Sequence, residues 1–306
     1  MLAPDNIAWM RTTGWQARLR AWWHGTTVTS GSTRQAPASA QPAAPVVTPP
    51  PVFWSAERRF VAQTVWGRGH LDPPGEAGVG RWLMTVGFDS AMTVANLGVK
   101  LGGSTATLHR LFKVYPKSFE ADPELAALAA EYAARLGLSR REAVQPFDPE
   151  EPQLKQGGFD RVVALEVMHG VAAKHEFLEG VCAALKPRGY LLLTGFALGE
   201  DADPGDPALE HWRAAEPGPR MLWPLSEMER ELGRRNMQVH VAADESDILR
   251  AAITEAWARV SIDPARIRAN PAIGVAMLAE AERWALCAAA LDAGVLRHTR
   301  IIAAMA

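Results

Sequence analysis

A glycine-containing turn followed by an acid about 20 positions later is the pattern in this chain best suited to chemistry. The apolar run 94–97 enters a turn that contains Gly98, Gly102 and Gly103, and Glu120 follows it. Glycine has no Cβ, so its backbone can approach a ligand, and amides at the start of the next helix favour an anionic group. An acidic side chain after the second strand can accept hydrogen bonds from both hydroxyls of a ribose. The pattern predicts a nucleotide-type site at the first strand–helix turn of an open α/β sheet.

The elements that must position this turn alternate between strand and helix. Strands are expected at 93–97, 115–119, 142–146, 159–165, 190–194, 237–241 and 295–302. Helices are expected at 53–64, 104–112, 123–136, 174–185, 225–234, 248–260 and 271–293. Continuous apolar strands that alternate with helices indicate a mostly parallel sheet covered by helices on both faces. The expected fold class is therefore α/β, with a seven-stranded sheet.

Two further motifs sharpen this interpretation. The fourth strand lies in Gly158-Phe-Asp-Arg-Val-Val-Ala-Leu-Glu-Val-Met-His169, and the turn into the fifth is Leu185-Lys-Pro-Arg-Gly-Tyr-Leu-Leu-Leu193. With the glycine turn, these motifs resemble those of class I S-adenosylmethionine (SAM)-dependent methyltransferases that act on small molecules or lipids. The resemblance covers about 60–302, with specific motifs at 94–194. It implies a Rossmann-like fold whose last strand inserts antiparallel, SAM as cofactor, and a small-molecule or lipid acceptor.

The resemblance also assigns site residues. It implies contact with SAM for Asn96, Gly98, Lys100, Gly102, Gly103, Glu120, Asp148 and Glu166. Asp148 follows the third strand, where the family often places an acid beside the adenine amino group. Glu166 and His169 follow the fourth strand, near the transferred methyl, and are the catalytic candidates, His169 as a general base or as a group that orients the substrate. Taken singly, Glu120 and Asp148 also suit surface carboxylates, and His169 suits a loop or helix-capping histidine.

Two residues depart from the family's Asp/Glu-x-Gly-x-Gly-x-Gly pattern. Asn96 replaces the acid and Lys100 replaces the central glycine. An inward lysine would obstruct SAM and repel its sulfonium, whereas an outward lysine can pair with the SAM carboxylate. The departure supports an alternative hypothesis, a methyltransferase-like binding or scaffold protein that has lost SAM. A dinucleotide-dependent oxidoreductase is a weaker interpretation, because the glycines do not follow Gly-x-Gly-x-x-Gly.

The segment Trp66-Gly-Arg-Gly-His-Leu-Asp-Pro73 resembles the N-terminal lid that such methyltransferases fold over the cofactor. Trp66, Gly67 and His70 are therefore assigned to the lid and the substrate side. Glycines permit motion, and Trp66 can exclude water from the site. Static packing of the tryptophan in the protein core explains the same residue equally well.

Composition divides the chain into an arm, a linker and one domain. The expected parts are a Trp/Arg-rich arm at 1–24, a Pro/Ala/Ser-rich flexible linker at 25–52, and a methyltransferase-like domain at 53–306. Within the domain, the lid is expected at 53–92, the SAM-site core at 93–198, and a substrate-side insertion with the closing strands at 199–306. Residues 5–23 suit contact with a membrane surface or a protein. Arginines among their apolar positions favour protein docking or partial disorder.

Charge, cysteine content and hydropathy limit the binding partners and the cellular location that we expect for the protein. The 306 residues carry a formal net charge of −2, which offers no electrostatic argument for nucleic-acid binding. Cys182 and Cys287 lack the spacing of a metal site, so no metal is expected. No apolar run approaches the roughly 20 residues that a membrane-spanning helix needs. The N-terminus does not resemble a signal peptide, so a cytoplasmic location is expected.

Overall fold

The structure is a computed structural model that describes residues 53–138 and 144–306, which belong to one compact unit. The expected arm at 1–24 and linker at 25–52 lie outside the described residues, and so does the docking segment at 5–23. Within the described part of the chain, no helix combines the length and the apolar character that crossing a membrane requires.

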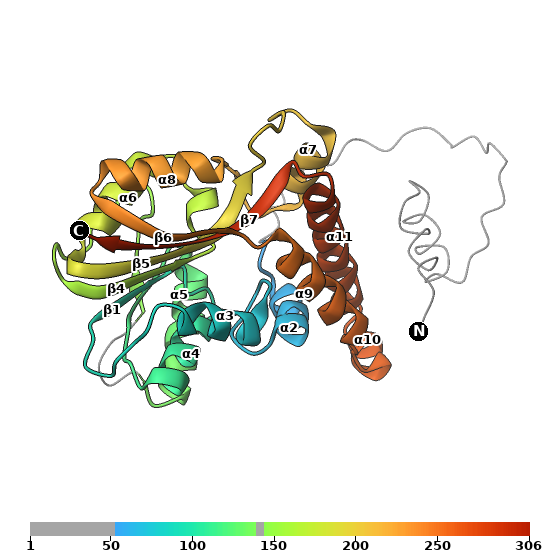
Figure 1. Cartoon of the computed structure of the whole chain (residues 1–306). Helices are drawn as coiled ribbons and strands as arrows, with labels where there is room; N and C mark the ends of the chain where they lie inside the picture. The colour runs from blue at the N-terminus through green and yellow to red at the C-terminus, as the bar shows by residue number, and fades with distance from the viewer. Residues whose placement is uncertain (1–52, 139–143) are drawn as a thin grey trace, which may run out of the picture. The chain divides into compact units, whose positions relative to one another are not determined.

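A seven-stranded sheet forms the centre of the domain, with strand order β3-β2-β1-β4-β5-β7-β6 (Figure 1). The strands are β1 (Val94–Leu97), β2 (Lys117–Glu120), β3 (Gln145–Pro146), β4 (Phe159–Leu165), β5 (Leu185–Leu198), β6 (Met237–Asp244) and β7 (Leu296–Met305). The pairs β1–β2, β2–β3, β1–β4 and β4–β5 are parallel, whereas β7 runs antiparallel to both β5 and β6. This arrangement confirms the predicted α/β class, the mostly parallel sheet and the antiparallel last strand.

Helices cover both faces of the sheet. They are α2 (Ala56–Trp66), α3 (Gly75–Met84), α4 (Gly103–Phe112), α5 (Pro123–Arg135), α6 (Lys174–Ala183), α7 (Pro207–Ala215), α8 (Leu225–Arg234), α9 (Ser246–Arg259), α10 (Pro264–Ala269) and α11 (Ala272–Asp292), with a short 3₁₀ helix η2 (Met168–Gly170). Figure 1 shows α6 and α8 on one face and α3, α4 and α5 on the other. Helix α11 packs against α2, α7 and α9 beyond one end of the sheet (Figure 1).

Three helices begin at an Asp-Pro pair. The carboxylates of Asp122, Asp206 and Asp263 accept hydrogen bonds from backbone amides in the first turn of α5, α7 and α10. The proline that follows each aspartate is suited to the first helical position, because its fixed φ matches the helix and its missing N–H would have had no partner there. Hydrophobic periodicity did not predict α7 and α10, since they have only 9 and 6 residues.

Strand β5 is longer than its sequence predicts. The apolar run predicts a fifth strand at 190–194, but β5 spans Leu185–Leu198. Strand β7 pairs with it from Tyr190 to Leu198, so the backbone remains extended beyond the apolar run. Pairing between strands, rather than local hydrophobicity, therefore sets the ends of β5.

The core around α11 contains large side chains that are almost completely buried. Trp284 is 1% exposed, and its ring packs edge-to-face on Trp66 with 5.3 Å between ring centroids. Cys287, one helical turn further on, is completely buried. Helix α11 therefore anchors α2 to the rest of the domain.

We expect Trp284→Ala to lower the free energy of unfolding by about 3–5 kcal/mol, because it leaves a large cavity between α11 and α2. Val275 lies on the same helix but is 68% exposed, so Val275→Ala should change stability by less than about 0.5 kcal/mol. Urea denaturation of both variants checks this. Equal effects of the two substitutions would contradict the packing described for α11.

Candidate functional site

A cavity of about 350 Å³ lies where β1, β2 and β4 end. Its wall includes the glycine turn after β1, the end of β2, the segment after β4, and residues of 216–220 and α11. A smaller cavity of about 40 Å³ shares Asp72, Gly98, Lys100 and Glu166 with it. Open α/β sheets bind ligands beyond the carboxyl ends of their strands, so this is the expected place for a site.

Gly98 and Lys100 give the glycine turn its backbone shape. Gly98 has φ = 70°, and a Cβ there would lie 2.4 Å from Cγ2 of Val167, so a larger residue does not fit. Lys100 also has a left-handed backbone, with φ = 52°. This conformation costs a residue with a Cβ about 1–2 kcal/mol, which explains why a glycine is usual at this position. The backbone of the motif is therefore retained in spite of the lysine.

Gly102 and Gly103 do not line either cavity. The amide of Gly103 donates to the carbonyl of Gly69 at 3.0 Å, and a Cβ on Gly103 would lie 2.5 Å from Nε2 of His70. Segment 67–70 thus packs directly against the start of α4. In this structure, Gly103 makes room for that segment rather than for a ligand.

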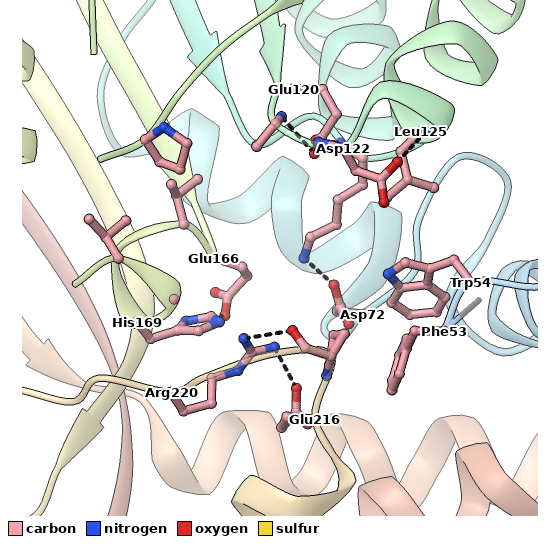
Figure 2. Close-up of a pocket in the computed structure, with 18 of the residues that line it drawn as sticks. Phe53, Trp54, Asp72, Glu120, Asp122, Leu125, Glu166, His169, Glu216 and Arg220 are labelled. Carbon is pink, nitrogen blue, oxygen red and sulfur yellow. Dashed lines mark hydrogen bonds and ion pairs between the residues drawn. The ribbon is translucent and has the colours of Figure 1, made fainter. Parts of the chain in front are cut away.

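The Lys100 side chain lines both cavities, which corresponds to the inward orientation. Its Nζ forms an ion pair with Asp72, whose other oxygen accepts a hydrogen bond from Arg283 at 3.0 Å (Figure 2). Burial raises the pKa of Asp72, but Lys100 and Arg283 outweigh it and hold that pKa at about 2. The ammonium of Lys100 is therefore held across the site by an ionised carboxylate.

Glu120 is 6% exposed, and its carboxylate faces the larger cavity. The Lys100 amide donates to Oε2 at 2.6 Å, and the Ala121 and Asp122 amides donate to Oε1 at 3.0 and 3.1 Å. Burial raises the pKa of Glu120, while these hydrogen bonds and the charge of Lys100 oppose the rise. Three amides therefore hold the carboxylate in one orientation, as a ribose-binding acid requires.

Asp148 lies outside the cavity, contrary to its assignment beside adenine. Its side chain is exposed and accepts a hydrogen bond from the amide of Glu150 at 2.9 Å, so it closes a local turn. Its neighbours Phe147 and Pro149 line the cavity instead. This loop therefore contributes an apolar surface and no acid.

Glu166 and His169 come together at the boundary of the larger cavity (Figure 2). Glu166 has φ = 57°, and its Oε1 accepts hydrogen bonds from Thr194 and His298, each at 2.9 Å. Nδ1 of His169 accepts the Phe196 amide at 3.2 Å, which places the ring proton of a neutral His169 on Nε2. Burial, followed by the charge of Arg220, keeps the pKa of His169 well below its usual range. His169 is thus arranged to donate a hydrogen bond, which fits an orienting role better than a general base.

The three residues assigned to the lid have different surroundings, and so has Asn96. Trp66 is 4% exposed, packs on Trp284 and lines neither cavity, so static packing explains it. Gly67 also lies outside both cavities, whereas His70 lines the smaller one. Burial and the charge of Lys100 lower the pKa of His70 to about 4, against the opposing effect of Asp72. The Asn96 side chain is completely buried, lines neither cavity, and donates to Ser104 and Thr105 at 2.9 and 3.1 Å.

Sequence analysis missed part of the cavity wall. Among the residues that it did not single out for the site are Phe53, Trp54, Asp72, Phe147, Glu216, Arg220 and Arg283. One available signal was the pair Glu280 and Arg283 in the apolar helix α11, because charged residues on a buried helix need partners. Among the described residues, no group of His, Cys, Asp and Glu is arranged to hold a metal ion.

Comparison with known proteins shows what the central part of the chain is similar to. A family model described as a methyltransferase domain matches residues 96–193, and no curated protein matches the chain. A phosphoethanolamine N-methyltransferase 2 of Haemonchus contortus aligns with a TM-score of 0.68 at 15% identity, over 81% of this chain and 56% of that one. This chain thus spans little more than half of that enzyme.

Two further solved structures are similar over most of their length. A putative sarcosine dimethylglycine methyltransferase of Galdieria sulphuraria aligns with a TM-score of 0.63 at 16% identity, over 76% of this chain and 84% of that one. A geranyl diphosphate C-methyltransferase of Streptomyces coelicolor aligns with a TM-score of 0.59 at 15% identity, over 75% and 76%. Residues 96–193 therefore resemble a methyltransferase domain, and the chain has the fold of the class I SAM-dependent methyltransferases.

Proposed function

We propose that this protein transfers a methyl group from SAM to a small-molecule or lipid acceptor. The observation that carries the proposal is the buried carboxylate of Glu120, which three backbone amides hold at the wall of the cavity. Two amides fill the acceptor positions of Oε1, but Oε2 accepts only one amide and keeps one position for a ribose hydroxyl. The matched methyltransferase domain supports the same assignment.

The cavity supplies contacts for the other parts of SAM. Leu125 and Phe147 offer apolar surface for an adenine ring, and Gly98 lets the backbone approach the ligand closely. Glu166 lines both cavities and places a carboxylate beside the junction where the positively charged sulphur would lie. Figure 2 shows Glu120 and Glu166 on different sides of the same space, as binding of an extended ligand between them requires.

The chemistry itself demands little of the protein. SAM, when bound, supplies a methyl group on a positively charged sulphur, which leaves as a neutral thioether when a lone pair of the acceptor takes the methyl. The protein contributes by positioning the acceptor and by excluding water. His169 can orient the acceptor through Nε2, and Trp54 and Phe53 form an aromatic wall on the opposite side of the cavity.

A second candidate function is a methyltransferase-like binding or scaffold protein without SAM. The Lys100–Asp72 ion pair crosses the region between the two cavities. The amide of Gly103 at the start of α4 already donates its hydrogen bond to the carbonyl of Gly69. Both features compete with the methionine part of SAM. SAM binding therefore requires the Lys100 side chain to leave Asp72, and the affinity is reduced by the cost of that change.

Titration with SAM by calorimetry, on the wild type and on Lys100→Gly, separates the two functions. We expect the wild type to bind SAM and Lys100→Gly to bind about 5- to 150-fold more tightly, because the glycine removes an obstruction that costs about 1–3 kcal/mol. Lys113→Gly is the matched control: Lys113 has φ = 58°, is exposed, and does not line the cavity. Binding by Lys100→Gly alone would support the scaffold function, and binding by neither protein would overturn the assignment of SAM.

We expect Glu120→Ala to weaken SAM binding by about ten- to a hundredfold, since it removes a charge-assisted hydrogen bond worth about 1.5–3 kcal/mol. Asp148→Ala should leave the affinity unchanged, because Asp148 is exposed and outside the cavity. Calorimetry measures the affinities, and circular dichroism checks that both variants are folded. If Asp148→Ala weakened binding and Glu120→Ala did not, the proposed orientation of SAM would be wrong.

A further inference from the structure

A buried network of ion pairs beside the cavity has more positive than negative members. It consists of Arg58, Lys100, Arg220 and Arg283, which pair with Asp72, Glu216 and Glu280. We call these seven residues the cationic network. The charge of Lys100 also acts on Glu120, so Lys100 has a second carboxylate, whereas Arg220 shares its only carboxylate, Glu216, with Arg283.

Two carboxylates of the cationic network keep their negative charge in spite of burial. Burial raises the pKa of Glu216, but Arg283 and Arg220 outweigh it and the pKa falls below its usual value. Asp72 behaves in the same way. The side chain of Glu280 is completely buried between Arg58 and Arg283. Nε of Arg220, in contrast, is buried and has no hydrogen-bond partner among the described residues, which is costly for a cationic group and favours an anion beside it.

Arg220 is the member of the cationic network with the weakest charge compensation. Its Nη2 donates to Glu216 at 2.9 Å, but Glu216 also accepts two hydrogen bonds from Arg283, at 2.9 and 3.0 Å. The other contacts of Arg220 are the carbonyls of Pro217 and Pro219, at 3.2 and 3.3 Å. Its side chain is 9% exposed, lines the larger cavity and lies near His169 (Figure 2).

Glu166, on the same side of the cavity, has no lysine or arginine partner among the described residues. Its Oε1 accepts hydrogen bonds from the Thr194 hydroxyl and from Nε2 of His298, and its side chain is 8% exposed. The Phe196 amide already occupies Nδ1 of His169, and the pKa of His169 lies well below its usual range, so His169 supplies no positive charge. Glu166 can therefore attract a cationic group bound in the cavity.

We propose that the acceptor is a small amine that also carries an anionic group, a carboxylate or a phosphate. The anionic group lies beside Arg220, whose carboxylate partner is shared with Arg283, and the nitrogen lies beside Glu166. This inference rests on the proposed function and narrows its acceptor class. The amine loses a proton to solvent, its lone pair forms the new C–N bond, and the methyl C–S bond breaks with both electrons passing to sulphur. Positive charge then moves from sulphur to nitrogen beside the carboxylate of Glu166, which attracts it in both places.

The test is calorimetric titration with three probes in the presence of saturating S-adenosylhomocysteine. The probes are 2-aminoethyl phosphate, glycine and ethanolamine, which carry an amine with a phosphate, with a carboxylate and with no anion. We expect at least one of the first two to bind about tenfold or more tightly than ethanolamine, and the stronger one identifies the anionic group. Equal affinities for all three probes would overturn the proposal.

Variants assign the anion to its site. Arg220→Gln should weaken binding of the preferred probe at least about tenfold and leave ethanolamine unaffected, while Arg220→Lys should retain part of the affinity. Arg213→Gln is the control, because Arg213 pairs with Glu210 at 2.7 Å and lies outside the cavity. Unchanged affinity of Arg220→Gln would overturn the proposal, and thermal melting of each variant checks the fold.

Binding of S-adenosylhomocysteine is measured first. This order distinguishes a failure of the proposed function from a failure of the proposed acceptor class. If it binds but the probes show no preference for an anion, only the acceptor class is wrong. If it does not bind, the proposed function fails, and titration of the protein alone with the same probes tests the anion site. Loss of probe binding in Arg220→Gln would then still support an anion site beside Arg220.

Discussion

The buried guanidinium of Arg283 connects the parts of the chain that enclose the cavity. It bonds Asp72 from the segment before α3, Glu216 from the segment after α7, and Glu280 one turn earlier in α11. Through Asp72 it also holds Lys100 of the glycine turn. A buried charge that loses one partner costs several kcal/mol. The cavity walls, which come from distant parts of the chain, therefore depend on one another for their placement.

The glycine turn has the backbone of a cofactor site, but the side chain of Lys100 reduces the space within that site. Lys100 adopts the left-handed conformation that glycine usually provides, and its amide still contacts Glu120. The same residue adds a side chain that lies between the two cavities. A glycine at this position provides both the left-handed backbone and the space for a ligand. In this chain, Lys100 provides the backbone geometry but fills part of the space. Displacement of one flexible side chain determines whether a ligand can use the whole site.

Much of the fold could be predicted from the sequence, because strands and long helices leave a local periodic signal. The seven strands, their mostly parallel arrangement and the antiparallel last strand all agree with the prediction. Local signals were less informative for α7 and α10, and for the ends of β5, where pairing with β7 extends the strand. The Asp-Pro pairs at Asp206 and Asp263 mark the starts of these two helices, but the helices are too short to show hydrophobic periodicity.

The sequence by itself determined the glycine turn, the acid at the end of β2, and the position of Glu166 after β4, because each depends on residues close together in the chain. Only the tertiary structure decided that Asp148 turns away, that Trp66 joins the core, and that segment 67–70 packs on Gly103. It also decided which charges face the cavity. Arg220 and Arg283 meet there because long-range ion pairs depend on where segments converge, and no local pattern records that convergence.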